Sequence, residues 1–198
     1  MTEVGFAIGN GMSREGWDLE QLRGHGTIVG CNWLYRDFSP DIIVALDAEP
    51  RREIAKIPYP EQRTWKWMTW EKNKAHLQLE GERAFPVIEI NRRTGKNSGI
   101  VAVSYLSKKL RCDKVYLVGF DFFRIHPGDK QNDIYHSMCL CRYRKFDLVF
   151  NQLFNDCPHT EFTRVGPVHP LDEKCFAAMN CDFIDFPEFE RRLKSGLL

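Results

Sequence analysis

The stretch Asn97–Phe122, NSGIVAVSYLSKKLRCDKVYLVGFDF, constrains the fold of this chain more than any other part. Its first half carries apolar residues at the spacing of one buried helical face: Ile100, Val103, Leu106 and Leu110. Its second half, Val115–Val118, is a short apolar run typical of a fully buried strand, and Gly119 and Asp121 follow it. A helix that leads into a buried strand is half of a parallel α/β repeat. The stretch therefore predicts an α/β fold.

Both ends of this helix–strand unit carry groups that can bind a ligand. Asn97 or Ser98 can cap the helix, and the amides of Ser98 and Gly99 at its N-terminus are expected to be free for an anion. Asp121 is expected at the carboxyl edge of the sheet, where open α/β folds bind ligands. The alternative is a well-capped core helix followed by an ordinary loop aspartate.

Polar residues follow three early apolar runs, at the point where each predicted strand ends. Val4–Ile8 precedes the loop Gly9–Ser13 (GNGMS), Thr27–Cys31 precedes Asn32, and Asp41–Leu46 precedes Asp47. The carboxyl ends of parallel strands meet at one edge of a sheet, so these positions predict a ligand site, although asparagine is also a common turn former. The glycine loop suits close approach of a phosphate, but it is neither the dinucleotide fingerprint nor a P-loop.

A basic loop precedes the central helix. Phe85–Ile90 is an apolar run, and the loop that follows it contains three cations: Arg92, Arg93 and Lys96. Three cations next to helix N-terminal amides form a receptor for phosphate or carboxylate. A solvated surface loop is the equally simple alternative.

A long polar segment, Phe123–Ser137, follows Asp121 and ends in Tyr135 and His136. Loops of this length in compact domains often bind ligands. The remaining predicted elements are a helix over Met138–Phe154, a strand over Phe162–Val165 and a charged helix over Asp185–Leu198.

Length and composition fit one α/β domain over residues 1–198. The chain has 28 basic and 27 acidic residues, so its charge gives no argument for nucleic acid or a membrane as partner. No apolar run reaches the length of a membrane helix, and seven scattered cysteines favour a reducing cytoplasm. No metal site is predicted, because Cys139 and Cys141 point to different faces of a predicted helix. Trp65 and Trp67 alternate with Lys66, which favours packing in the core over nucleic-acid stacking.

Five segments, taken in order, resemble the small Rossmann-like bacterial sialyltransferases that use CMP-sialic acid: GNGMS, CNWLY, ALDAE, NSGIVAVSYL and VYLVGFDF. They are also similar to the related MptE-like family, which includes pterin pyrophosphokinases. The resemblance spans Val4 to Gly166. It implies a single Rossmann-like domain with a mostly parallel sheet flanked by helices.

The resemblance also implies roles for individual residues. The nucleotide would be held by Gly9, Asn10, Gly11, Ser13, Asn32, Asp47, Asn97, Ser98, Gly99, Gly119 and Asp121. His136 matches the general base of the sialyltransferases, and Arg93 lies near the position of the arginine that grips the carboxylate of the sugar. Phe123 replaces a tyrosine that steadies the leaving phosphate, and Tyr135 matches a second one. Asp47 stands where the family has an amide.

The sequence thus predicts an enzyme, a metal-independent glycosyltransferase that moves a sugar from a nucleotide-sugar donor to an acceptor hydroxyl. His136 would take the hydroxyl proton, and the amides of Gly11 and Ser98 would hold the phosphate. No cofactor is expected beyond the nucleotide sugar, and the acceptor would be a glycan, a small molecule or a modified nucleic-acid base. Two alternatives stay open: a non-catalytic nucleotide-binding protein, or a pyrophosphokinase whose ATP-bound Mg²⁺ is held by Asp47 and Asp121.

Overall fold

The computed structural model describes residues 3–54, 56–57, 66–69, 84–86, 97–121, 135, 146–167 and 180–198. Their strands form one eight-stranded sheet in the order β5-β4-β3-β2-β1-β6-β7-β8. The strands are β1 (Val4–Ile8), β2 (Thr27–Cys31), β3 (Ile42–Val44), β4 (Lys66–Thr69), β5 (Ala84–Pro86), β6 (Lys114–Val118), β7 (Glu161–Val165) and β8 (Cys181–Ile184). Every pair of neighbouring strands is parallel, which confirms the predicted α/β architecture.

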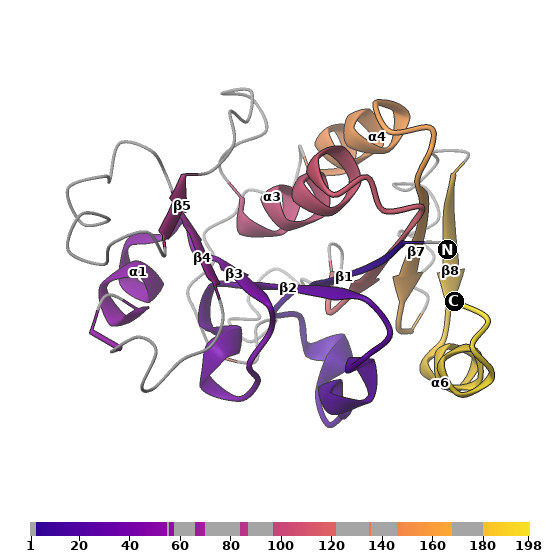
Figure 1. Ribbon diagram of the computed structural model, residues 1–198, viewed down its shortest axis with the longest axis horizontal. Coiled ribbons are helices and arrows are strands. Elements are labelled where there is room, and N and C mark those ends of the chain that lie inside the picture. Colours follow the sequence, from indigo (N-terminus) through magenta and orange to yellow (C-terminus); the bar gives the residue numbers. More distant parts are fainter. Residues whose placement is uncertain are drawn as a thin grey trace, which may run out of the picture.

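Helices cover both faces of this sheet (Figure 1). The α-helices are α1 (Ala48–Ile54), α3 (Ser98–Ser104), α4 (Phe146–Asn155) and α6 (Phe186–Ser195). The shorter ones are the 3₁₀ helices η1 (Met12–Arg14), η2 (Leu19–Leu22) and η3 (Asn32–Arg36), and a π-helical turn, η6 (Tyr105–Lys109), that continues α3. α3 and α4 lie on one face, whereas α1, the 3₁₀ helices and α6 lie on the other.

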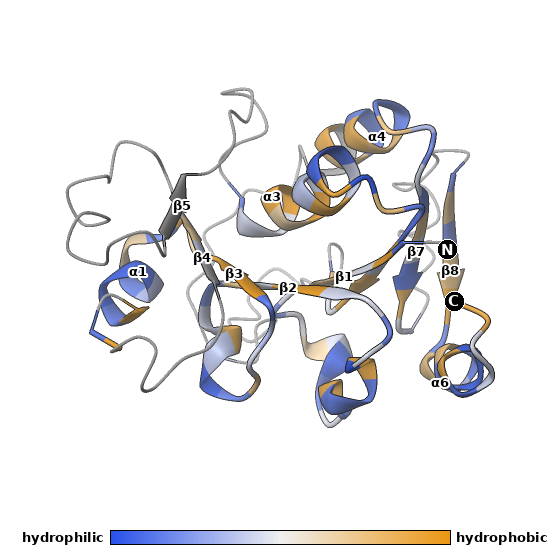
Figure 2. Ribbon diagram, in the orientation of Figure 1, coloured by the Kyte–Doolittle hydropathy of each residue, from blue (hydrophilic) through white to orange (hydrophobic). Residues whose placement is uncertain are grey.

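Two hydrophobic cores lie on the two faces of the sheet. Residues along β1 alternate between them, so that Ala7 packs with α3 whereas Phe6 and Ile8 pack with α6. Figure 2 shows hydrophobic residues along the strands and on the helix sides that face the sheet. Trp67 in β4 is 2% exposed, which confirms its predicted place in the core. Trp65 lies outside the described residues.

The strand order reverses next to β1. From β1 the chain steps outward through β2, β3 and β4 to β5, and then returns through α3 to β6, which pairs with the other side of β1. In open α/β sheets, ligands bind at such a switch point, outside the carboxyl ends of the strands. The loops that follow β1 and β6 therefore mark the candidate site.

Local signals explain where α3 and α6 begin and end. Asn97 caps α3, because its Oδ1 atom accepts hydrogen bonds from the amides of Gly99 and Ile100 at 2.8 and 3.2 Å. Asp185 caps α6 in the same way. Gly196 ends α6 at φ 67°, a left-handed conformation that favours glycine.

Three elements differ from the expectation. The helix expected to continue to Leu110 changes at Tyr105 into η6, where the Leu110 amide donates to the Tyr105 carbonyl five residues earlier. The edge strand β8, Cys181–Ile184, was not expected, because only its last residue is buried and it therefore lacks an apolar run. α4 begins at Phe146 in the described part, and residues 138–145 of the predicted helix lie outside that part.

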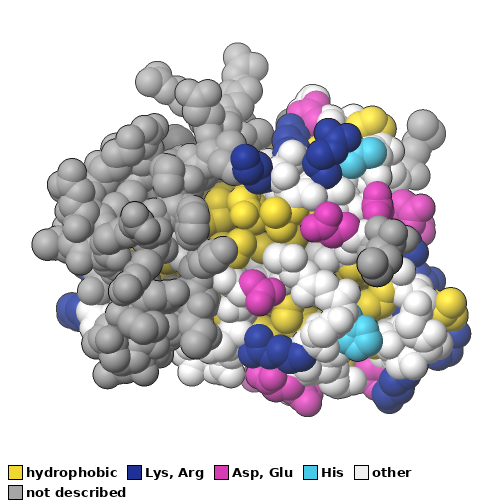
Figure 3. Space-filling model, in the orientation of Figure 1, with side chains coloured by type: hydrophobic (Ala, Val, Ile, Leu, Met, Phe, Trp, Pro, Cys, Tyr) yellow, Lys and Arg dark blue, Asp and Glu magenta, His cyan; other side chains and the backbone are white. Residues whose placement is uncertain are grey.

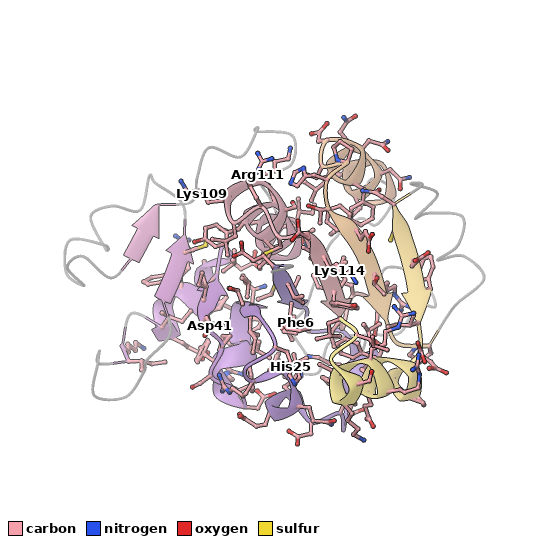
Figure 4. All side chains as sticks on the ribbon, turned by 45° about the vertical axis from the view of Figure 1, so that its right-hand side comes forward. Phe6, His25, Asp41, Lys109, Arg111 and Lys114 are labelled. Carbon is pink, nitrogen blue, oxygen red and sulfur yellow. The ribbon has the colours of Figure 1, made fainter. Side chains whose placement is uncertain are left out.

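The surface carries both signs of charge. In Figure 3 the basic and acidic side chains are interspersed over the described part of the visible face. Figure 4 labels Lys109, Arg111 and Lys114, which lie at or just before the start of β6 and thus at the amino edge of the sheet, away from the switch-point loops. None of the helices in the described ranges has the length and apolar character needed to cross a membrane.

Candidate functional site

The switch point is built from two backbones in direct contact. The Gly9 amide donates to the Val118 carbonyl at 2.8 Å, and the Gly11 amide donates to the Gly119 carbonyl at 2.9 Å. A Cβ atom on Gly9 would collide with the Gly119 carbonyl oxygen, and Gly119 itself has φ +71°. These glycines therefore allow the chain after β1 to run against the chain after β6.

We expect Gly9→Ala to lower the free energy of unfolding by about 3 kcal/mol, because the obstructing oxygen belongs to the backbone and cannot move aside cheaply. Urea denaturation measures this loss. Gly24→Ala is the control, since Gly24 has φ +80° but a Cβ atom there would meet no other part of the protein within 4 Å. Its cost should be only about 1 kcal/mol. Equal losses in the two variants would contradict the contact-based explanation.

Asp121 lies at the carboxyl edge, as predicted, but its carboxylate is paired inside the protein. Its Oδ2 atom accepts from the Ser13 amide at 2.6 Å, and its Oδ1 atom lies 3.6 Å from Arg164 Nη2. The side chains of Asp121 and Arg164 are only 2% and 1% exposed. Arg164 was not predicted as a site residue, although a charged residue inside the apolar strand β7 is a signal that could have identified it.

Two of the amides expected to bind phosphate, those of Gly11 and Gly99, already have protein acceptors. The Gly11 and Ser13 amides donate to the chain after β6, and the Gly99 amide donates to Asn97. The expectation of free amides at Gly11 and Gly99 was therefore wrong, whereas that for Ser98 stays a prediction. Buried amides need partners, and a carbonyl, a carboxylate and an N-cap side chain supply them here without a ligand.

A chain of side-chain hydrogen bonds joins the ends of β2 and β3 to the start of α3. Asn32 Nδ2 donates to Asp47 Oδ2 at 3.0 Å, and the Ser98 hydroxyl donates to Asn32 Oδ1 at 2.8 Å. The Leu46 amide in turn donates to Ser98 Oγ at 3.3 Å. Asn32 has φ +48°, a conformation that asparagine adopts more readily than most residues. The structure thus brings together three predicted site residues, Asn32, Asp47 and Ser98, which we call the Asn32 network.

The Asn32 network is buried at one end and open at the other. Ser98 is 3% exposed, whereas Asp47 is exposed. Neighbouring protein atoms still desolvate the Asp47 carboxyl in part and raise its pKa above the usual value, and the Asn32 N–H opposes this effect. Burial raises the pKa of the adjacent Cys31 thiol to about 12, so this thiol is not a nucleophile near neutral pH.

The loop after β1 holds buried oxygen atoms that lack hydrogen-bond partners. Within the described part of the chain, these are Asn10 Oδ1 and Ser13 Oγ, and Asp121 Oδ1 nearby also lacks one. An unpaired buried polar atom costs about 1–3 kcal/mol. A ligand hydroxyl or amino group, or a water molecule, would recover that cost. Asn10 and Ser13 therefore remain candidates for ligand contacts.

Tyr135 directs its hydroxyl toward the protein. The hydroxyl donates to Asp37 Oδ1 at 2.6 Å and accepts from Arg14 Nη2 at 3.1 Å. A phenol has one proton, so in this arrangement Tyr135 does not donate to a leaving phosphate. His136 and Arg93 lie outside the described residues, and their roles stay predictions.

A hollow of about 230 Å³ adjoins the loop after β1 and is lined by residues 14–20, Asp37 and Phe38. It borders Arg14 and Asp37 rather than the Asn32 network. Over the ranges that the structure describes, no three His, Cys, Asp or Glu side chains gather into a potential metal site.

An all-parallel sheet with a glycine-lined switch point and polar side chains at its carboxyl edge defines a Rossmann-like α/β protein. No protein-family model matches the chain, and a search of curated proteins finds no match. The relationship to sialyltransferases and MptE-like proteins thus stays a prediction from the sequence motifs.

Proposed function

We propose that the carboxyl edge binds the nucleoside of a nucleotide sugar, and that the protein transfers the sugar to an acceptor hydroxyl without a metal ion. The Asn32 network is the observation that carries this proposal. It presents the exposed Asp47 carboxylate, held by the Asn32 amide and through it by the buried Ser98 hydroxyl, beside the switch point, where folds of this kind bind nucleotides.

The exposed carboxylate of Asp47 is suited to recognise hydrogen-bond donors. It can accept hydrogen bonds from ribose hydroxyls or from an amino group of a base. Asn32 donates a hydrogen bond to Asp47, and the buried Ser98 donates one to Asn32. The Asp47 carboxylate is therefore oriented before a ligand binds. Such preorganisation lowers the entropy cost of binding.

Backbone amides of the loop after β1 are already hydrogen-bonded within the protein, which favours a sugar donor with a single phosphate group. P-loop proteins cradle two or three phosphates with free backbone amides, but the Gly11 and Ser13 amides are already bonded. The phosphate of a nucleoside monophosphate sugar would instead meet side chains, and the cations of the basic loop, Arg92, Arg93 and Lys96, are the groups we propose for it.

The pyrophosphokinase alternative needs both Asp47 and Asp121 as ligands of Mg²⁺. The Asp121 carboxylate is 2% exposed, accepts the Ser13 amide and faces the guanidinium of Arg164. A cation at that position would be repelled by Arg164. The pairing of Asp121 with Arg164 therefore supports the transferase proposal over the pyrophosphokinase alternative.

The proposed reaction is a direct displacement. The acceptor oxygen attacks the anomeric carbon of the sugar, and the bond from that carbon to the phosphate oxygen breaks. The nucleotide leaves with the bonding electron pair, and His136 takes the proton of the acceptor hydroxyl.

We expect CMP or a CMP sugar to stabilise the protein by about 2.7 kcal/mol at a concentration of 100 times its Kd. A thermal-shift series measures the stabilisation. Transfer of the sugar, or hydrolysis of the nucleotide sugar, should persist in EDTA. Loss of turnover in EDTA and recovery with Mg²⁺ would favour the pyrophosphokinase, and binding without turnover would favour a non-catalytic protein.

Asn32→Gly tests the network itself, because glycine accepts the positive φ of this position while removing the amide. The nucleotide-dependent stabilisation should shrink in this variant. Asn155→Ala, at the exposed end of α4, is the control and should keep it. Unchanged stabilisation in Asn32→Gly would remove the network from the binding site.

A further inference from the structure

Arg14 follows the glycine loop directly, yet its side chain is only 4% exposed. Its Nε atom donates to the Gly9 carbonyl at 2.7 Å. Its aliphatic stem lies against Gly119, where a Cβ atom would come within 2.9 Å of Arg14 Cδ. One buried side chain therefore contacts both backbones that meet at the switch point.

The charge of Arg14 is matched by the carboxylate of Asp37, and the neutral phenol of Tyr135 bonds to both. Asp37 Oδ2 lies 4.0 Å from Arg14 Nη1, and the Tyr135 hydroxyl lies between the two, bonded to both. Desolvation and the hydrogen bond to Asp37 raise the pKa of Tyr135, so its hydroxyl stays protonated near neutral pH. Hydrogen bonds to charged groups are stronger than those between neutral groups, so the Tyr135 hydroxyl stabilises the pairing of Arg14 with Asp37.

These three residues come from three separate connections. Arg14 lies between β1 and β2, Asp37 between β2 and β3, and Tyr135 between β6 and α4. Arg14 and Tyr135 are 121 positions apart in the chain. Asp37 also follows directly on η3, the short helix that begins at Asn32. A shift of Asp37 would therefore reach the Asn32 network through the five residues of η3.

We infer that Arg14, Asp37 and Tyr135 form a clamp, the Arg14 clamp, that holds the Gly9–Ser13 loop and the start of η3 in the geometry that binds the nucleotide. Arg14 and Tyr135 are positioning residues in this inference, because their polar atoms bond to the protein. The identity of the ligand in this inference rests on the proposed function. The effect of the clamp on the Gly9–Ser13 loop does not depend on that function.

Tyr135→Phe is the decisive variant, because it removes one oxygen atom and keeps the ring. Tyr35→Phe is a matched control. The Tyr35 hydroxyl donates to Glu53 at 2.7 Å, and Glu53 pairs with Arg36 at 2.6 Å. This cluster also combines a tyrosine, a carboxylate and an arginine, but none of its three residues belongs to the Gly9–Ser13 loop.

The first measurement is amide hydrogen exchange in the nucleotide-free protein. In Tyr135→Phe, exchange at Gly11 and Ser13 should become about 10-fold faster, the equivalent of losing one hydrogen bond to charged groups. Arg14→Lys should act in the same direction, since a lysine lacks the planar fork that reaches Gly9 and Tyr135 together. Tyr35→Phe should leave these amides unchanged. Unchanged exchange in Tyr135→Phe would overturn the clamp.

The second measurement is the Kd of CMP, by titration calorimetry. Tyr135→Phe should raise it about 10-fold, and Asn155→Ala, at the exposed end of α4, should not. Faster exchange with an unchanged Kd would overturn the role of the clamp in binding. If wild-type protein does not bind CMP but exchange still rises, the proposed function fails while the clamp stands as the device that orders the loop.

Discussion

His136→Ala is expected to lower the rate of sugar transfer by about 10²–10⁴-fold, the usual range for loss of a general base. The imidazole would act on the acceptor hydroxyl and not on the phosphate, so nucleotide affinity should change little. The wild-type rate should also fall on acidification through the ordinary histidine pKa of about 6.5, because a protonated ring cannot accept the proton. Steady-state kinetics and a pH profile measure both effects.

Three other histidines serve as controls for this prediction. His126 lies in the same segment of sequence, His169 follows β7, and His25 precedes β2 at the amino edge (Figure 4). Alanine at each of these positions should leave turnover unchanged. If His136→Ala keeps full turnover while His126→Ala or His169→Ala loses it, the base lies elsewhere. If all variants stay active, the reaction uses no histidine base.

Arg164→Met is expected to lower the free energy of unfolding by about 3–5 kcal/mol, because it leaves the buried Asp121 carboxylate without its cation. The change also removes the donors that Arg164 gives to the Phe120 and Pro167 carbonyls at 3.1 and 2.8 Å. Urea denaturation near neutral pH measures the loss.

The double variant Asp121→Asn/Arg164→Met separates these two causes. The asparagine keeps an acceptor for the Ser13 amide and removes the charge, so the double variant should lose less than the sum of the single losses. Arg191→Met is the control, because Arg191 is 61% exposed in its pair with Glu188 and should cost less than about 1 kcal/mol. Additive losses would show that Asp121 and Arg164 do not act as a pair.

These two predictions concern different properties of the protein. His136 would perform the chemistry, whereas Asp121 and Arg164 hold the loop after β1 against the loops after β6 and β7. Stability measurements on Arg164→Met need no substrate. They therefore remain informative whatever the acceptor proves to be.

The sequence by itself determined the bounds of β1 and β2 and the polar or glycine residues that follow them. β2 has the predicted bounds Thr27–Cys31, and β1 those of Val4–Ile8, because a buried parallel strand is a local apolar run bounded by polar or glycine residues. The cap at Asn97 was predictable for the same reason, since an N-cap bonds to amides two and three residues away. Because the strands were predicted to be parallel, Asn32 and Asp47 were expected at the carboxyl edge of the sheet.

Only the tertiary structure decided how the groups at that edge are paired. Arg14 meets Tyr135 across 121 positions and Ser13 meets Asp121 across 108, and both contacts depend on β6 returning to the side of β1. No local pattern encodes that strand order. The same return brings the acceptors that occupy the Gly11 and Ser13 amides, so amides that a local pattern marks as free become bonded once the sheet is assembled.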